Sequence, residues 1–423
     1  MKIMVVGGGG REHAIIKKIK ENKNVTEIFA LPGNGGIAKD AVCVNIGAKD
    51  IEGITKFAAD NAIDFAVVAP DDPLVLGAVD SLSAIGVPCF GPAANAAIIE
   101  GSKVFSKNLM KKYNIPTARY EVFSAAADAL GYIENCTYPI VIKADGLALG
   151  KGVIIAENKA AALDAVHSVM EDKIFGASGN SVVIEEFLRG PEVSVLCFTD
   201  GKTIKPMVSS MDHKRIGDGD GGPYTGGMGT IAPNPYYTDD IAAICMETIF
   251  KPTINAMNAE GRTFKGCLYF GLMLTPNGPK VIEYNCRFGD PETQVVLPLL
   301  ESDLLEIMKA TANGTLDQVE VKFADKAAAC VVMASDGYPV KYESGFEIDL
   351  PAELADNENI YIAGAKLDGD KLLTAGGRVL GAVAVEDNLK AALLSAYKLV
   401  GQIKFGNAVY RKDIGAKALK VEG

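Results

Sequence analysis

The sequence has no run of 18 or more apolar residues, so a transmembrane helix is not expected. Its eight cysteines are scattered without any Cys-x-x-Cys pair, which argues against a zinc site or a disulfide framework and fits reduced cytoplasmic thiols. The start, Met1 to Val6, reaches glycine too soon to form the core of a signal peptide. We therefore expect a cytoplasmic protein without a membrane partner.

An excess of positive charge is also missing, because the net charge is −11. Non-specific nucleic-acid binding needs basic surface and is not expected. Any phosphate-bearing ligand must then be held by local clusters. The composition is otherwise that of a globular protein, with 48% apolar and 22% charged residues, and 423 residues favour two to four domains. Boundaries are expected near residue 100, before a helix capped by Ser102, and near Phe323.

Polar residues gather in one stretch between apolar flanks, from Val281 to Glu292. Its first half has the pattern of a strand, so Glu283 and Asn285, two residues apart, point to the same face. A carboxylate and an amide suit Mg²⁺ whose other ligands come from a nucleotide. Arg287, a planar fork for carboxylate or phosphate, follows together with Asp290. The alternative is an edge strand that ends in a charged turn.

The N-terminus reads as strand, glycine turn and helix, the opening of a doubly wound sheet with an anion site at the helix N-terminus. A dinucleotide site does not fit, because Glu12 or His13 occupies the position of the third glycine. The next strand ends in Pro32 to Gly36 without an acid for a ribose. A phosphate-bearing substrate or a purely structural turn remain open. A third strand, 65–69, ends at Pro70 and Asp71.

Two strands flank the glycine-interrupted loop 145–152. Gly146 and Gly150 enclose three residues where a P-loop has four, so this is not a Walker motif. Such a loop can fold its N–H groups over phosphates as a lid, or it is a plain hairpin. Lys143 lies in an otherwise apolar strand and needs an anionic partner.

Two further stretches carry candidate ligands. The connector Glu185 to Leu188 can offer backbone hydrogen bonds to an adenine edge and Glu192 can accept from ribose hydroxyls, although each acid singly is an ordinary surface residue. The glycine-rich loop 217–229 is long for a compact domain, which favours a function. His213, Lys214 and Arg215 beside it supply positive charge.

The C-terminal part predicts strands over 328–333, 361–367 and 378–385 and a helix over 389–400 with an apolar stripe. It forms a third core-forming unit in which little chemistry is visible.

Several stretches together resemble one family closely, the phosphoribosylamine–glycine ligases of the ATP-grasp superfamily. The stretches that carry the resemblance are Gly8–Ala14, Pro32–Asn34, Glu100–Lys103, Ile142–Ala148, Gly150–Val153, Asp212–Arg215, Thr225–Gly229, Asn285–Gln294, Gly376–Val379 and Tyr410–Gly415. Two stretches depart from the family pattern: Ala69-Pro70-Asp71 stands where Gly-Pro-Glu is usual, and Tyr224 where Asn is usual. They bear only on the pocket for the amine substrate.

The resemblance implies an α/β and α+β multidomain protein. We expect a doubly wound parallel sheet in the N-terminal domain (1–101), a central ATP-grasp domain (102–324) with a mobile lid at about 121–190, and a small α+β C-terminal domain (325–423). A monomer is expected.

It also implies site residues. Mg²⁺ or Mn²⁺ would be held by Glu283 and Asn285. ATP would be bound by Lys103, Lys143, Gly150, Lys151, Gly152, Glu185, Glu186, Phe187, Leu188 and Glu192. The expected catalytic residues are Arg287, Lys143, Asp212 and Lys214. The substrates would contact Gly9, Gly10, Arg11, Glu12, Pro32, Gly33, Asn34, Asp71, Asp212, His213, Lys214, Gly226, Gly227, Met228, Arg287, Asp290, Pro291 and Glu292.

The implied reaction is phosphorylation of glycine by ATP, followed by attack of the 5-phosphoribosylamine amine on the acyl phosphate. Positioning and charge control dominate such chemistry, because a γ-phosphoryl must approach a carboxylate of like charge. Three other functions are weighed: a different carboxylate–amine ligase, a non-catalytic ATP sensor, and a dehydrogenase that binds NAD in the first domain. The intact metal pair and lysines argue against the sensor.

Overall fold

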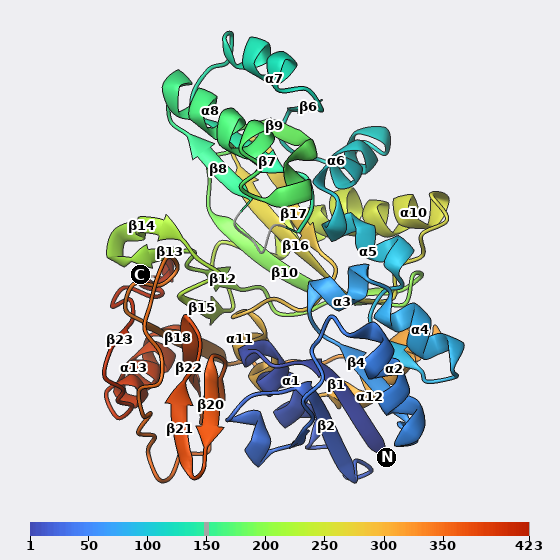
Figure 1. Ribbon diagram of the computed structural model, residues 1–423, viewed down its shortest axis with the longest axis vertical. Helices are drawn as coiled ribbons and strands as arrows, with labels where there is room; N and C mark the ends of the chain where they lie inside the picture. Colours follow the sequence, from blue (N-terminus) through green and yellow to red (C-terminus); the bar gives the residue numbers. More distant parts are fainter. Residues whose placement is uncertain (148–151, 423) are drawn as a thin grey trace.

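The computed structural model describes residues 1–147 and 152–422. Figure 1 shows a small sheet with α7 and α8 at the top, an antiparallel sheet through the centre, and two sheets below that come from the first and last parts of the chain. These two lower parts touch through α1 and β19. Among the described residues, no helix is long and apolar enough to cross a membrane.

The N-terminal sheet is parallel, with strand order β3-β2-β1-β4-β5. Its strands are β1 (Lys2–Gly7), β2 (Glu27–Pro32), β3 (Val42–Cys43), β4 (Phe65–Val68) and β5 (Cys89–Phe90). Its helices are α1 (Gly10–Ile19), α2 (Ile51–Asp60), α3 (Asp71–Val75), α4 (Ala78–Ala84) and α5 (Ala94–Gly101). This order confirms the predicted doubly wound sheet, whose crevice lies at the carboxyl ends of β1 and β4.

The sheet at the top, here called the lid sheet, is antiparallel with order β6-β9-β7-β8. Its strands are β6 (Tyr120–Phe123), β7 (Ile140–Ala144), β8 (Val153–Ala156) and β9 (Val182–Glu186). The helices α7 (Ala126–Ile133) and α8 (Lys159–Val166) pack their small apolar residues on Ile142 and Ile184. One face of the lid sheet is therefore left for a ligand or for the central sheet.

The central sheet has order β11-β10-β16-β17, also antiparallel. Its strands are β10 (Glu192–Thr199), β11 (Ile204–Pro206), β16 (Gly266–Thr275) and β17 (Gly278–Asn285). The surrounding helices are α6 (Lys103–Lys112), α9 (Asp239–Cys245), α10 (Lys251–Ala259), α11 (Thr293–Val296) and α12 (Leu304–Asn313).

The last sheet combines distant segments in the order β12-β15-β18-β22-β19, with β23 beside β18. Its strands are β12 (Met211–Asp212), β15 (Gly229–Ala232), β18 (Ala327–Ser335), β19 (Glu358–Ile362), β22 (Arg378–Glu386) and β23 (Ala408–Val409). Two hairpins, β13 (Arg215–Gly217) with β14 (Gly221–Tyr224) and β20 (Ala365–Asp368) with β21 (Lys371–Thr374), and two helices, α13 (Leu389–Val400) and α14 (Ala416–Glu422), complete it.

The single strand expected over 361–367 is wrong. β19 ends at Ile362, because the chain then leaves β22 and Ala365 begins a hairpin in which β20 pairs with β21 alone. The helix predicted over 389–400 has the expected bounds.

Three phenylalanines tie the first domain to the central sheet. Phe90, Phe198 and Phe288 lie with ring centroids 5.9–6.2 Å apart and are almost fully buried. Aromatic pairs of this kind contribute about 0.5–1.5 kcal/mol each beyond their buried area. Because Phe288 directly follows the polar stretch at the end of β17, this contact fixes the polar stretch against the N-terminal sheet.

Candidate active site

The polar stretch lies at the end of β17, where that strand pairs with β16. Glu283 and Asn285 are partly exposed, whereas Tyr284 between them is buried with its hydroxyl 3.0 Å from that of Thr253. The alternation places Glu283 and Asn285 on the same face of the sheet, as the sequence predicts. The Asn285 side-chain oxygen accepts a hydrogen bond from Arg287 at 3.1 Å and keeps a second lone pair.

Glu283 lies among several positively charged side chains. Burial alone would raise the pKa of its carboxyl, but four cationic side chains outweigh burial and lower that pKa. These cations are Lys214, Lys143, Lys103 and Arg287. Within the described residues, none of them lies within 4.0 Å of the Glu283 oxygens as a salt bridge. The carboxylate is thus held ionised with its oxygens left for another partner.

Lys143 finds its anionic partner in Glu185, on the neighbouring strand β9. The Lys143 ammonium lies 3.0 Å from Glu185 Oε1 and donates to the carbonyl of Ile282 at 3.0 Å. Lys107 of α6 holds the other carboxylate oxygen of Glu185 at 2.9 Å and donates to Thr117 at 2.8 Å. Burial lowers the pKa of Lys107 to about 8, against the field of Glu185. This buried triad of two lysines and one glutamate joins the lid sheet to α6 and β17.

The start of the glycine-interrupted loop is fastened to the N-terminus of α6. Lys103 donates to the carbonyl of Gly146 at 2.6 Å, and Asp145 accepts from the Ser102 hydroxyl at 3.0 Å and from the Val104 N–H at 3.2 Å. Ser102 also caps α6, as predicted, through the N–H of Phe105. At the other end Gly152 accepts from Ala144 at 2.8 Å. The predicted ligands Gly150 and Lys151 lie outside the described residues.

The predicted connector Glu185–Leu188 begins within the last two residues of β9. The Glu186 side chain pairs with Arg119 at 2.9 Å and with Lys280 at 3.1 Å. These hydrogen bonds overcome burial and lower the pKa of Glu186 to about 2. Phe187 and Leu188 are partly exposed, and Glu192 at the start of β10 is exposed. The Glu186 side chain is thus an anchor for the connector, whose backbone remains the candidate ligand.

A further lysine, Lys214, reaches the site from the C-terminal sheet. Lys214 lies 2.9 Å from Asp212, whose other oxygen accepts from the N–H of His213 at 2.7 Å. Burial opposes the charge on Lys214, but Asp212 and the neighbouring acids raise its pKa. Glu292 is one of those acids, is 3% exposed, and accepts from the Tyr269 hydroxyl at 3.0 Å. Gly227 closes this corner: its φ is +114°, and a Cβ there would lie 2.6 Å from Asp212 Oδ1.

Arg287 turns toward the N-terminal domain. Its guanidinium contacts Glu100 at 3.0 Å, and Glu100 also accepts from the Cys286 N–H at 2.7 Å. Asp71 and Arg11 face the same group: the pKa of Asp71 lies below its ordinary value because Arg287 and Arg11 outweigh its burial. The Nε of Arg287 is buried without a partner among the described residues. A buried unpaired donor next to a ring of charges is a candidate ligand contact.

The glycine turn before α1 packs against the polar stretch. Arg11 donates to the carbonyl of Phe288 at 3.1 Å, and a Cβ on Gly9 would lie 3.4 Å from Asp290. Glu12, at the end of the turn predicted to bind substrate, also has a structural role. Its two oxygens accept from the Gly9 N–H at 2.5 Å and from Arg11 at 2.6 Å, so it caps its own helix.

Three more residues predicted to touch substrate make hydrogen bonds within the fold. Asn34 spends its whole amide on backbone groups of Gly8, Gly36, Ile37 and Ile362, and so fixes the turn after Pro32 and Gly33. His213 accepts from the Gly415 N–H and donates to the carbonyl of Gly229, both at 3.1 Å. Met228 is fully buried, and its N–H and carbonyl bond to His213 and Val332. These contacts fix the turns that carry the three residues, and their contacts with substrate stay predictions.

Sequence reasoning missed Lys107 and Glu100, as well as Arg378 from the C-terminal domain. Arg378 donates to the carbonyls of Gly226 and Asp290, both at 2.8 Å, and lies 3.4 Å from the Asp290 carboxylate. Glu100 and Arg378 stand within stretches that carry the family resemblance, which was a usable signal. Lys107 gave none, because a lysine on a helix is normally solvated.

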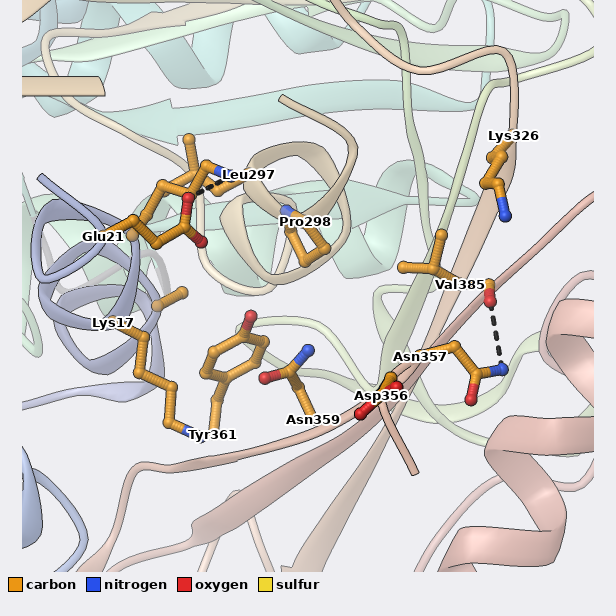
Figure 2. Close-up of a pocket in the computed structure, with 12 residues that line it drawn as sticks. Lys17, Glu21, Leu297, Pro298, Lys326, Asp356, Asn357, Asn359, Tyr361 and Val385 are labelled. Atoms are coloured by element: carbon orange, nitrogen blue, oxygen red, sulfur yellow. Dashed lines mark hydrogen bonds and ion pairs between the residues drawn. The ribbon is translucent and has the colours of Figure 1, made fainter. Parts of the chain in front are cut away.

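A cavity of about 410 Å³ lies elsewhere, between α1, the loop after α11 and β19 (Figure 2). Lys17 stands 5.5 Å from the centroid of the Tyr361 ring at its edge. Two other lysines of the lining are already paired, Lys18 with Glu21 at 2.8 Å and Lys326 with Asp387 at 3.3 Å. None of the site residues predicted from sequence lines this cavity, and its mixed charges do not favour one class of ligand.

Comparison with known proteins agrees with this geometry. The phosphoribosylglycinamide synthetase N domain matches residues 1–100, its ATP-grasp (A) domain matches residues 101–293, and its C domain matches residues 328–417. The chain belongs to the phosphoribosylglycinamide synthetase family. The sequence-based family assignment is thereby confirmed, together with the ATP-grasp fold.

Relatives span almost the whole chain. A phosphoribosylamine–glycine ligase of Caldanaerobacter subterraneus subsp. tengcongensis is 47% identical over 98% of this chain and 100% of its own length. The crystal structure of a phosphoribosylamine–glycine ligase from Thermotoga maritima has a TM-score of 0.87 at 32% identity, covering 98% of this chain and 100% of that one. A biotin carboxylase domain from Hydrogenobacter thermophilus, in complex with MgADP, has a TM-score of 0.76 at 14% identity, covering 100% of this chain and 94% of that one, and shows the shared fold alone.

Proposed function

We propose that this protein ligates glycine to 5-phospho-D-ribosylamine at the expense of ATP, giving glycinamide ribonucleotide, ADP and phosphate in de novo purine biosynthesis. The observation that carries the proposal is the Glu283 carboxylate, which faces four cations and has no salt-bridge partner in the part of the chain that the structure describes, in a chain that matches all three domains of the family. The glycine carboxylate attacks the γ-phosphoryl group, and glycyl phosphate is the intermediate that the amine then captures.

The donor set at the end of β17 fits a hard divalent cation. Among residues 1–147 and 152–422, no salt bridge holds the Glu283 oxygens and the Asn285 side-chain oxygen accepts a single hydrogen bond, and carboxylate and amide oxygens are what Mg²⁺ or Mn²⁺ binds. Glu283 and Asn285 would hold the ion, which when bound neutralises charge on the nucleotide phosphates.

Four groups of this chain bind ATP in the proposal. Lys103 and Lys143 face Glu283 and contact the phosphates, and the backbone of the connector Glu185–Leu188 contacts the adenine edge. Glu192 accepts from the ribose. Since the triad already holds Lys143 in place, it costs little entropy to bind phosphate there.

Glycine and its acyl phosphate lie between Arg287 and the Asp212–Lys214 pair. Lys214 supplies a positive charge where the carboxylate and the transferring phosphoryl group repel each other. The phosphoribosylamine lies toward the N-terminus of α1, where the turn at Gly9, Gly10 and Arg11 offers partial positive charge to its phosphate. Asp71, Gly33 and Asp290 line the same side.

An acyl phosphate hydrolyses in water, so the site must exclude water while the amine arrives. We propose that the lid, residues 121–190 within an ATP-grasp domain of 102–324, closes on bound nucleotide. The remaining domains are 1–101 and 325–423. The protein is proposed to be cytoplasmic and monomeric. Sedimentation at several protein concentrations measures the oligomeric state.

An assay of ADP release tests the proposal. Sustained release is expected only when ATP, glycine and phosphoribosylamine are all present, with one glycinamide ribonucleotide per ADP. Release that depends on another amino acid or amine would indicate a different carboxylate–amine ligase. ATP binding without turnover in any mixture would indicate a sensor and overturn the proposal.

A further inference from the structure

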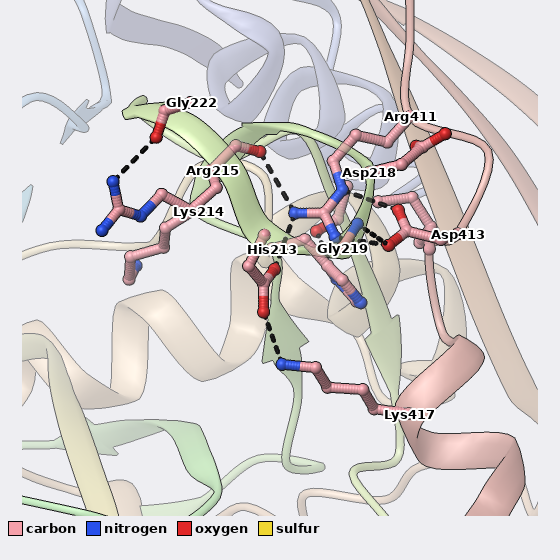
Figure 3. A network of polar contacts seen from close by, with 12 residues as sticks. His213, Lys214, Arg215, Asp218, Gly219, Gly222, Arg411, Asp413 and Lys417 are labelled. Carbon is pink, nitrogen blue, oxygen red and sulfur yellow. Dashed lines mark hydrogen bonds and ion pairs between the residues drawn. The ribbon is translucent and has the colours of Figure 1, made fainter.

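The hairpin formed by β13 and β14 is covered on one side by the C-terminal segment 411–417 (Figure 3). The hairpin begins one residue after Lys214, and Thr225 at its end donates twice to the Lys214 carbonyl, at 2.7 and 2.8 Å. The backbone of Lys214 is therefore the base of this hairpin. Contacts that fix the hairpin therefore also fix the orientation in which the Lys214 side chain enters the site.

Arg411 is the centre of the contact. It is 2% exposed and binds Asp413 with two nitrogens, at 2.8 and 2.9 Å. Its third nitrogen reaches the hairpin twice, at the Arg215 carbonyl at 3.1 Å and the Asp220 carboxylate at 2.9 Å. A planar fork with several fixed donors can hold two acids and a carbonyl at once, which a lysine ammonium cannot reproduce in the same geometry.

Backbone groups extend this contact along the hairpin. At its tip, Asp218 accepts from the N–H of Lys412 at 2.7 Å, and the N–H of Gly219 donates to Asp413 at 2.8 Å. At its base, His213 accepts from the N–H of Gly415 at 3.1 Å. The segment 411–417 thus contacts both ends of the hairpin. Lys417, labelled in Figure 3, forms a more exposed pair with Asp220.

We infer that Arg411 is a positioning residue for the reaction: through Asp413, Asp220 and the Arg215 carbonyl it holds the hairpin so that the Asp212–Lys214 pair faces glycine and its acyl phosphate. The inference rests on the proposed function of Lys214. Arg411 itself touches neither nucleotide nor substrate in this arrangement. ATP is bound by other elements, α6, β7 and β17, so loosening the hairpin should spare ATP binding and impair the use of glycine.

The test compares Arg411→Lys, which keeps the charge and loses the fork, with Lys417→Met, which removes only the exposed pair. Arg411→Lys is expected to lower kcat/KM for glycine about tenfold and to leave ATP affinity within about twofold, whereas Lys417→Met stays within about twofold in both. ADP released per product formed should rise in Arg411→Lys, because a misplaced acyl phosphate is lost to water. Asp220→Asn, a milder change at the hairpin tip, is the second variant if Arg411→Lys does not fold.

A double-mutant cycle separates positioning from general stability. In a Lys214→Met background, Arg411→Lys should lower kcat/KM no further, since the group on which it acts is gone. Equal losses for ATP and glycine, or additive losses in the double mutant, would overturn the inference.

Amide hydrogen exchange over 212–225 reads the contact without substrates and so remains informative if the proposed ligase activity is not found. Faster exchange there in Arg411→Lys, with unchanged exchange in the N-terminal sheet, is expected, and unchanged exchange over 212–225 would also overturn the inference.

Discussion

Residues 145–152 and 212–229 are both rich in glycine, and both lie beside lysines that face Glu283. Their surroundings differ. The described contacts of the first segment lie at its ends, where Asp145 and Gly146 meet α6 and Gly152 pairs with β7. The second is held along its length by the C-terminal domain through Arg411, Arg378 and the backbone of 412–415. The high glycine content of 212–229 therefore does not make this segment a free loop, because the C-terminal domain holds its backbone.

The largest effect is expected at the buried triad that anchors β7, the strand leading into the first segment. Glu185→Gln leaves Lys143 and Lys107 buried without a counter-charge and should cost about 3–5 kcal/mol in the free energy of unfolding. Lys143→Met leaves a neutral Lys107–Glu185 pair, so its stability should change little while ATP affinity falls more than about tenfold. Urea denaturation and calorimetry measure both, and equal stability of the two variants would contradict the triad as an anchor.

The second-largest effect is expected at Glu283, whose carboxylate faces lysines beside both segments. Glu283→Ala should leave the fold intact and lower turnover at least about 100-fold, or about 2.7 kcal/mol of transition-state stabilisation. Glu320→Ala, at an exposed acid paired with Lys322, is the matched control with no expected change. Near-normal turnover of Glu283→Ala at limiting Mg²⁺ would remove Glu283 from the metal site.

Limited proteolysis separates the two segments directly. From the glycine spacing of 145–152 we expect trypsin to cut after Lys151 in the free protein, and ATP with Mg²⁺ to slow that cut about tenfold as backbone donors gain phosphate partners. Cleavage after Arg215 in the hairpin should change little with nucleotide, and NAD should protect neither position. Equal protection of both sites by ATP would erase the distinction between them.

The smallest expected effect is a pH dependence of the stability, which arises from His213 in the second segment. Burial and the charge of Arg411 lower the pKa of His213 from 6.5 to about 4, against the fields of Asp220 and Asp413. Because the unfolded chain then binds a proton that the folded one does not, stability falls as pH drops from 6.5 toward 4. The loss at pH 6 should be about 1 kcal/mol.

His213→Gln, which keeps a donor and an acceptor but does not titrate, should lack this component. Thermal unfolding of the two proteins at pH 7.5 and pH 6 measures the difference. Identical pH dependence would show that His213 does not carry it.

The sequence by itself determined the elements with strong patterns. The apolar strands 2–6 and 65–69 and the amphipathic helix 389–400 form as expected. Their apolar residues can be buried together only if the segment adopts the secondary structure that matches their spacing. The alternation along the strand also predicted that Glu283 and Asn285 lie on one face. The sequence motifs alone were enough to identify the family. The roles of the site residues in catalysis and binding stay predictions.

Only the tertiary structure decided which charged groups meet. The ion-pair partners Lys107 and Glu185 are 78 residues apart in the sequence. Strand β15 pairs with β18, about a hundred residues further along the chain, and Gly229 lies opposite Val331. Short strands of two or four residues carry too little pattern to specify such pairing. His213, Asn34 and Glu12 look like ligands in sequence, because polar side chains near glycine have the same local pattern whether they bind substrate or satisfy buried backbone groups. In the folded protein all three side chains form hydrogen bonds with backbone groups. An unpaired buried N–H or carbonyl would be costly in any folded state.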